Sequence, residues 1–182
     1  RKTNELSETV DLNEAARDVI ELAGSELRRS RVELETSLAA DLPPVIGDRV
    51  QLQQVILNLL LNAADALSAV RDRPRRALLK TSEDEDGNVR LTVQDSGVGI
   101  DPDSLIKIFD AFYTTKASGM GIGLSVSRSI IERHGGRIWA SVNDGPGASF
   151  SFAVPRSPNR SAEGGAAALS ARMQLHSGGE GQ

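Results

Sequence analysis

The segment SGMGIGLSVSRSIIERHGG, residues 118–136, places three glycines where a helix should begin. Ile122, Val126 and Ile130 recur at helical spacing and predict one apolar stripe, while the closing Gly-Gly pair predicts the helix end. Glycine loses more backbone freedom on ordering than other residues, so these glycines weaken the first helical turn. The first N–H groups of a helix are unpaired and carry partial positive charge, and glycines leave them open to phosphate oxygens. The segment therefore predicts a phosphate site at a helix N-terminus.

The composition is that of a globular chain of about one domain, because 182 residues with 39% hydrophobic side chains can bury a core. A net charge of −4 predicts no general attraction to nucleic acid or anionic membranes. The absence of cysteine excludes disulfide and thiolate chemistry and agrees with a reducing compartment. We expect a cytoplasmic part of a longer protein, itself soluble or membrane-anchored, because the chain begins with Arg1 and has no apolar run of about 20 residues.

Helical and strand patterns alternate only partly along the chain. Helices are expected at residues 12–30, with Asp11 as N-cap, and at residues 49–70. Strands are expected at residues 32–38, 77–82, 88–94, 137–142 and 148–154, the last four as two hairpins. Helices segregated from paired strands predict an α/β fold with a helix layer on a mixed sheet.

Two charged segments link these elements. For RDRPRR, residues 71–76, a solvated loop is favoured over a contact with phosphate or a partner. For EDED, residues 83–86, a solvated hairpin tip is favoured over a metal site.

The helix at residues 49–70 has two faces. Its predicted core stripe consists of Leu52, Val55, Ile56, Leu59, Ala63 and Leu67. Its narrow polar stripe consists of Gln54, Asn58, Asn62 and Asp65. Asparagine is a poor interior helix former, and two asparagines one turn apart offer neutral oxygens suited to Mg²⁺. A plain solvent face is the equally weighted alternative.

The strand at residues 88–94 leads into an inward-pointing aspartate. Asp95 continues the parity of Leu91 and Val93, and a buried carboxylate needs hydrogen-bond donors. The exocyclic amine of a purine would be such a donor, and Gly97 and Gly99 would let the backbone approach a flat ligand. An acidic turn before a glycine loop is the alternative.

The segment IFDAFYTTK, residues 108–116, gathers three aromatic side chains before the glycines. For Phe109 and Phe112 we favour a role as anchors of the loop. Thr114, Thr115 and Lys116 would supply two hydroxyls and a cation to phosphates.

These four segments, in this order, resemble the N, G1, F and G2 boxes of the ATP-binding domain of sensor histidine kinases. That domain belongs to a superfamily with DNA gyrase B subunits, MutL proteins and heat-shock protein 90. The resemblance covers residues 9–155. The joint TTK…GMGIGLS, with almost no lid between its two boxes, is similar to that of the short-lid nitrogen-regulatory and oxygen-sensing kinases. It implies a two-layer α/β sandwich of a mixed, mostly antiparallel sheet against helices (a Bergerat-type ATP-binding fold).

The resemblance also implies roles for residues. Asn62 would hold Mg²⁺, Asp95 would bind adenine, and Asn58 and Lys116 would be the catalytic candidates. The implied ATP site consists of Asn58, Asn62, Asp65, Asp95, Gly97, Gly99, Ile100, Thr115, Lys116, Gly119, Gly121, Ile122, Gly123 and Leu124. The chain departs from the family pattern at Asp65, where many kinases have a lysine or arginine, so that Lys116 replaces this cation. It also has Ala111 where the F box usually has proline.

Three functional classes follow from the resemblance. The favoured class is the Mg²⁺-ATP-binding domain of a histidine kinase that phosphorylates a histidine on a neighbouring dimerisation domain. ATP-hydrolysing machines of the superfamily carry a glutamate base one turn before the metal asparagine, where this chain has Asn58, whose amide cannot take a proton. A nucleotide-sensing module or anti-sigma serine kinase is the third class.

The resemblance places the phosphoacceptor elsewhere. Neither His134 nor His176 has the His-Glu or His-Asp setting of an acceptor, and His134 is interpreted as a helix C-terminal residue. We expect residues 1–8 to be a linker from the dimerisation and phosphoacceptor domain, and residues 156–182 to be a disordered tail. The expected partners are that domain and a response regulator receiver domain. The fragment should be monomeric and its parent homodimeric.

Overall fold

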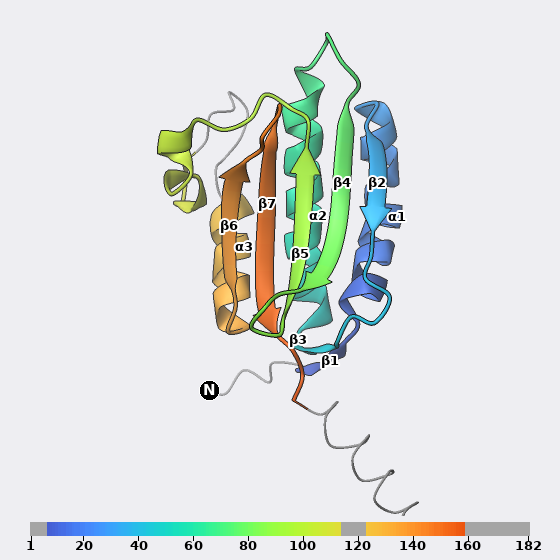
Figure 1. Cartoon of the computed structure of the whole chain (residues 1–182), viewed down its shortest axis with the longest axis vertical. Coiled ribbons are helices and arrows are strands. Elements are labelled where there is room, and N and C mark those ends of the chain that lie inside the picture. Colours follow the sequence, from blue (N-terminus) through green and yellow to red (C-terminus); the bar gives the residue numbers. More distant parts are fainter. Residues whose placement is uncertain (1–6, 114–122, 159–182) are drawn as a thin grey trace, which may run out of the picture.

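Among the described residues, three α-helices cover one face of a five-stranded sheet (Figure 1). The structure is a computed structural model and describes residues 7–113 and 123–158. The helices are α1 (Leu12–Arg29), α2 (Arg49–Ser68) and α3 (Gly123–Arg133). The central helix, α2, packs against both α1 and α3. The two layers confirm the expected α/β sandwich.

The sheet is mixed and mostly antiparallel, as expected. Its strands are β2 (Glu33–Ser37), β4 (Arg76–Glu83), β5 (Asn88–Asp95), β6 (Arg137–Val142) and β7 (Ala148–Pro155). They lie in the order β2-β4-β5-β7-β6, in which only the β2–β4 pair is parallel. Both predicted hairpins form, and Gly87 adopts φ +78° in the first turn.

Four short elements were not predicted from the sequence. β1 (Glu8–Val10) pairs with β3 (Val45–Gly47) in an antiparallel ribbon, and η1 (Pro102–Ser104) and η2 (Lys107–Phe109) are single 3₁₀ turns. Three residues are too few to show a period, so sequence analysis could not detect them.

The helix ends follow local chemistry. Asp11 caps α1 by accepting the Glu14 N–H at 3.1 Å, as predicted. Asp48 caps α2 in the same way, because its Oδ1 accepts the Gln51 N–H at 3.1 Å. α2 ends at Ser68, two residues before the predicted end at residue 70.

The core lies between the helices and the sheet. The predicted α2 stripe is buried throughout. The predicted stripe of the following helix is wrong at Val126, whose side chain is 38% exposed. Ile130 is buried as predicted, and α3 also buries Ser127 and Ile131, because these residues face α2 and the sheet. Ile122, the first member of the predicted stripe, lies outside the described residues.

His134 has a larger structural role than the helix-end position assigned from sequence. Its Nδ1 donates to the Ile130 carbonyl oxygen at 2.7 Å, and its Nε2 accepts the Asp48 N–H at 3.0 Å. The imidazole therefore joins the end of α3 to the start of α2. Gly47 lies against the ring, where a Cβ would overlap it.

The packed chain continues just past β7, so the expected disordered tail does not begin at residue 156, while residues 159–182 lie outside the described residues. Ser157 is buried and its N–H donates to the Pro44 carbonyl oxygen at 2.7 Å, while Arg156 contacts Glu83 at 3.2 Å. These residues lie at the end of the sheet opposite the C-terminus of β5 (Figure 1).

Candidate nucleotide-binding site

Predicted site residues from three elements lie around the end of the sheet where β5 stops, at the top of Figure 1. They come from the polar stripe of α2, the turn after β5 and the first residues of α3. Along α2, Asn58 contacts α3 and Ala66 contacts the turn after β5. At 1.5 Å per residue these two positions are about 12 Å apart, comparable with an extended nucleotide.

The polar stripe of α2 is placed as predicted. Asn58 and Asn62 are half-buried, whereas Gln54 and Asp65 are exposed. The roles of Asn62 and Asp65 in binding metal or nucleotide remain predictions.

Asn58 is oriented by the start of α3. Its Nδ2 donates to the Gly123 carbonyl oxygen at 3.3 Å and to Ser127 Oγ at 3.2 Å, and Ser127 Oγ donates to the same carbonyl at 2.9 Å. Because a carbonyl oxygen only accepts, the amide nitrogen of Asn58 must face α3. Its Oδ1 therefore points away from Gly123. Sequence analysis did not single out Ser127, since a serine in a helix carries little signal.

Asp95 is the buried carboxylate of the site. It continues the inward alternation of β5 and its side chain is 3% exposed. Burial raises the pKa of Asp95, while hydrogen bonds from the backbone N–H groups of Gly97, at 2.8 Å to Oδ1, and Ala148 oppose the shift. A further donor, such as a purine amine, would suit this carboxylate.

The turn between β6 and β7 holds Asp95 from one side. Asn143 Nδ2 donates to the Asp95 carbonyl oxygen at 2.9 Å, and Ser149 Oγ donates to Asn143 Oδ1 at 2.7 Å. Gly147 adopts φ +90° and lies against Asp95, where a Cβ would overlap the Asp95 backbone. No sequence pattern marked Asn143, because its contact is with a segment distant in sequence.

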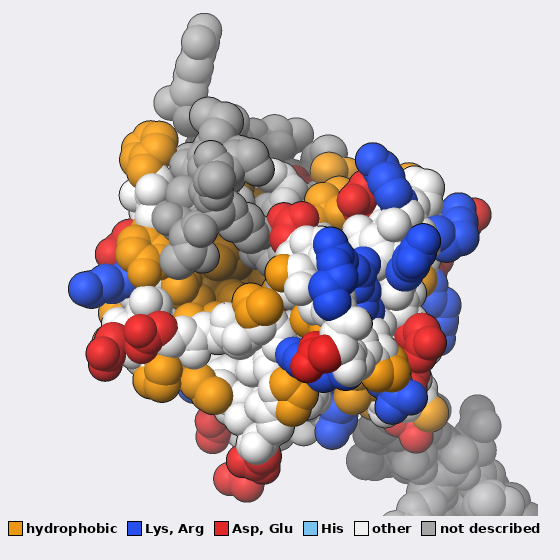
Figure 2. Space-filling view, turned by 90° about the horizontal axis from the view of Figure 1, so that it is seen from above, with side chains coloured by type: hydrophobic (Ala, Val, Ile, Leu, Met, Phe, Trp, Pro, Cys, Tyr) orange, Lys and Arg blue, Asp and Glu red, His pale blue; other side chains and the backbone are white. Residues whose placement is uncertain are grey.

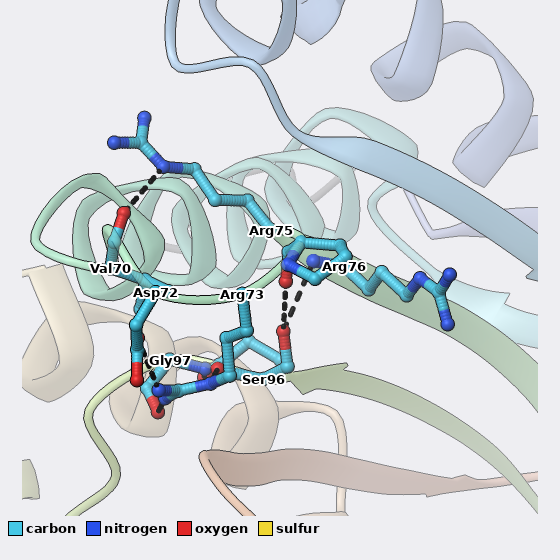
Figure 3. A network of polar contacts seen from close by, with 9 residues as sticks. Val70, Asp72, Arg73, Arg75, Arg76, Ser96 and Gly97 are labelled. Atoms are coloured by element: carbon cyan, nitrogen blue, oxygen red, sulfur yellow. Dashed lines mark hydrogen bonds and ion pairs between the residues drawn. The ribbon is translucent and has the colours of Figure 1, made fainter.

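The loop before β4 holds the same turn from the other side (Figure 3). Arg73 donates to the carbonyl oxygens of Ser96 and Gly97, at 3.1 and 2.8 Å. Arg75 donates to the carbonyl oxygens of Val70, Ser30 and Ser68, at 3.0, 2.7 and 3.1 Å. Most of this segment is exposed, as the favoured solvated loop predicts, but Arg73 and Arg75 are half-buried and bind backbone carbonyl oxygens of the fold.

Glycines allow the close approach of these segments. Gly97 lies on α2, where a Cβ would be 2.9 Å from the carbonyl carbon of Ala66. Gly99 adopts φ +78°, which favours glycine. Both glycines therefore serve contacts within the fold, and their predicted role of letting the backbone approach a flat ligand stays a prediction.

The other predicted residues divide into two groups. Ile100 and Leu124 are partly buried against the core, and Gly123 begins α3. Thr114, Thr115, Lys116, Gly119, Gly121 and Ile122 lie outside the described residues, so their roles remain predictions.

The loop after β5 exposes apolar side chains. Phe109 is buried as predicted, but Phe112 is 75% exposed with φ +66°, so the prediction that it anchors the loop is wrong. Val98 and Ile106 are also exposed. Seen from this end, hydrophobic side chains gather on the α3 side and basic side chains on the α1 side (Figure 2).

The acidic hairpin tip forms a turn. Asp84 accepts N–H groups from Asp86 and Asn88 at 3.0 and 2.9 Å, and these bonds lower its pKa. Within residues 7–113 and 123–158, no group of three or more His, Cys, Asp or Glu residues is placed to hold a metal ion. The hydrogen-bonded turn agrees with the favoured hairpin-tip interpretation.

The fold and this site define an ATP-binding domain of a known class. The sequence profile of the family described as histidine kinase-, DNA gyrase B- and HSP90-like ATPases matches residues 47–158. The chain belongs to this family, and it corresponds to the ATP-binding catalytic domain of sensor histidine kinases.

Individual kinases support this assignment. The chain is 42% identical over 134 residues to the sensor protein FixL of Bradyrhizobium diazoefficiens, covering 74% of this chain and 26% of FixL. It is 38% identical over 149 residues to the signal transduction histidine-protein kinase AtoS of Escherichia coli, covering 82% of this chain and 24% of AtoS. The chain thus spans about a quarter of these relatives.

Solved structures agree on the fold. The nucleotide-free catalytic domain of histidine kinase ThkA superposes with a TM-score of 0.72 at 34% identity, covering 84% of this chain and 97% of that one. Full-length ShkA in complex with AMPPNP superposes with a TM-score of 0.74 at 29% identity, covering 86% of this chain and 32% of that one. ThkA in complex with the response regulator protein TrrA superposes with a TM-score of 0.70 at 32% identity, covering 85% of this chain and 43% of that one. No helix of the described part of this chain is long and apolar enough to span a membrane.

Proposed function

We propose that this chain binds Mg²⁺-ATP and transfers the γ-phosphoryl group to a histidine on a dimerisation domain of its parent protein. The observation that carries the proposal is the buried Asp95 carboxylate, which has two backbone donors and lies in the turn that packs against α2 at Ala66. Asp95 accepts the adenine amine. The nucleotide then extends along the Asn58–Asn62 stripe toward α3.

The side chains of α2 suit a hard cation. Asn58 directs its amide nitrogen toward Gly123, so that its oxygen faces the other side. Mg²⁺ usually takes one or two protein oxygens and completes its shell with water and phosphate, so Asn62, assisted by Asn58, would be sufficient. The metal would neutralise charge on the phosphates.

The chain's own contribution to transfer is positioning. Asp95 fixes the base, and the N-terminus of α3 directs backbone N–H groups at phosphate. During transfer the bond from the γ-phosphorus to the bridging oxygen breaks, ADP leaves, and a bond forms to the acceptor imidazole nitrogen. Asn58 cannot act as a base toward water, which disfavours hydrolysis.

The proposal extends to the parent protein. Residues 1–8 would connect residues 9–155 to the dimerisation and acceptor domain. A response regulator would then receive the phosphoryl group, by analogy with ThkA, which forms a complex with the response regulator protein TrrA.

Transfer of label from γ-labelled ATP tests the proposal. The chain alone is expected to bind Mg²⁺-ATP without labelling itself, and acid-labile label should appear only when the acceptor domain is added. Rapid phosphate release by the chain alone would favour the hydrolase class, and acid-stable label on a serine would favour a serine kinase.

Calorimetric titration tests the adenine contact separately. Asp95→Asn should weaken ATP and ADP alike, because the substitution removes a hydrogen bond to the base, which both nucleotides share. Unchanged ADP affinity in a folded variant would contradict the role of Asp95.

A further inference from the structure

One peptide group lies between a guanidinium group and the Asp95 carboxylate. The carbonyl oxygen of this Ser96–Gly97 peptide accepts from Arg73 Nε at 3.1 Å, and its N–H donates to Asp95 Oδ1 at 2.8 Å. The next carbonyl, that of Gly97, accepts from Arg73 Nη2 at 2.8 Å. Figure 3 shows Arg73 extending from the loop before β4 to this turn.

We propose that Arg73 is a positioning residue for adenine recognition, holding the Ser96–Gly97 peptide in the orientation that directs its N–H at Asp95. The inference rests on the proposed function, because it requires Asp95 to receive the adenine.

The need for such a residue follows from Gly97. Glycine permits several backbone conformations, so the peptide before it can rotate at little steric cost. A rotated peptide would direct its carbonyl oxygen at the Asp95 carboxylate and remove one of the two backbone donors that oppose the rise in pKa. Arg73 prevents this rotation by binding two successive carbonyl oxygens.

The arrangement also strengthens the bond to Asp95. A guanidinium group that binds a carbonyl oxygen polarises the peptide and makes its N–H a better donor. Because the peptide is planar, the effect passes directly from Arg73 to the carboxylate.

Neighbouring contacts fix Ser96 and Arg73 in place. Ser96 N–H donates to the Arg76 carbonyl oxygen at 3.0 Å, and Ser96 Oγ accepts the Arg76 N–H at 3.1 Å. Arg73 Nη1 contacts Asp72 Oδ1 at 3.0 Å. All three nitrogens of Arg73 therefore have partners within the fold, which opposes the alternative that Arg73 binds phosphate or a partner protein.

Arg75 provides a matched control. It lies in the same loop and also binds backbone carbonyl oxygens, but these belong to Val70, Ser30 and Ser68 rather than to the turn after β5. Replacing either arginine removes a charge and hydrogen bonds to the backbone, whereas only replacement of Arg73 affects Asp95.

The experiment compares Arg73→Met with Arg75→Met in the whole chain, by ADP titration calorimetry and by the amide spectrum without nucleotide. For Arg73→Met we expect ADP affinity to fall about tenfold, the loss of a charge-assisted hydrogen bond, and the Gly97 amide proton to move upfield. For Arg75→Met we expect an affinity within about twofold of wild type and an unchanged Gly97 amide, even if stability falls. Arg73→Lys, which can bind one carbonyl at a time, should lie between Arg73→Met and wild type.

A double variant separates the inference from the proposed function. In an Asp95→Asn background, Arg73→Met should lower ADP affinity no further. If Asp95→Asn leaves ADP affinity unchanged, the proposed role of Asp95 fails. Two outcomes would overturn only the inference about Arg73. In the first, Asp95→Asn lowers ADP affinity but Arg73→Met and Arg73→Lys do not. In the second, Arg75→Met lowers ADP affinity as much as Arg73→Met does.

Discussion

Substitution of Gly97 by alanine tests the geometry of the site at its tightest point. A Cβ at this position would lie 2.8 Å from Asp95 Oδ1 and 2.9 Å from both the carbonyl carbon and the Cβ of Ala66. Two of these atoms cannot move easily, because the carbonyl carbon belongs to α2 and the carboxylate is buried. The turn must therefore move away from the helix.

The expected size of the effect follows from overpacking. Forcing an extra methyl group into a packed site costs about 1–3 kcal/mol, which lowers the Tm of a domain of this size by about 3–12 °C. Because the same movement displaces Asp95, the proposed adenine ligand, ADP affinity should fall at least about tenfold, equivalent to about 1.4 kcal/mol. Thermal denaturation and calorimetric titration measure the two effects.

Gly145 supplies the matched control. It lies in the turn between β6 and β7, where a Cβ would meet no atom within 4 Å, and it is not among the glycines with positive φ. Gly145→Ala should keep the wild-type ADP affinity and a Tm equal to wild type or slightly higher. A Gly97→Ala variant with wild-type Tm and ADP affinity would refute the packing of this turn against α2.

Three further predictions concern the polar side chains of the site. Asn62→Ala should abolish the Mg²⁺ dependence of ATP affinity, measured by titration with and without the metal, while the Tm stays close to wild type; an unfolded variant would make Asn62 structural. Asn58→Ala and Ser127→Ala should each lower the free energy of unfolding by about 1 kcal/mol, and the double variant should lose about 0.5 kcal/mol less than the sum; strict additivity in urea denaturation would contradict their hydrogen bond. Because the pKa of Asp95 is raised in the fold, the native state binds more protons than the unfolded state near that pKa, so the contribution of Asp95 to stability is greatest at low pH and declines as pH rises through its folded pKa. The free energy of unfolding of wild type minus that of Asp95→Asn should accordingly decrease from acidic to neutral pH, and a difference that increases would show that Asp95 is not desolvated.

Local sequence determined the longer secondary elements and the positions of several candidate site residues. The Asp11 cap, the Gly87 turn and the alternation that turns Asp95 inward involve neighbouring residues, so the chain order alone reveals them. The polar stripe of α2 is similarly local, because residues four apart share a helix face. The α2 stripe and the Asp95 segment, together with residues 108–116 and 118–136, also carried the family resemblance, which the comparisons confirm.

Tertiary structure decided which side chains support the site. Arg73 and Ser96 are 23 positions apart, and Asn58 and Ser127 are 69 apart, so no local period links them. The same reason explains the errors at Val126 and Phe112, since exposure depends on where a distant element packs. Sequence could propose that Asp95 binds a base. Only the folded chain shows which backbone groups hold its carboxylate, because those contacts exist only after the loops on both sides of β5 come together.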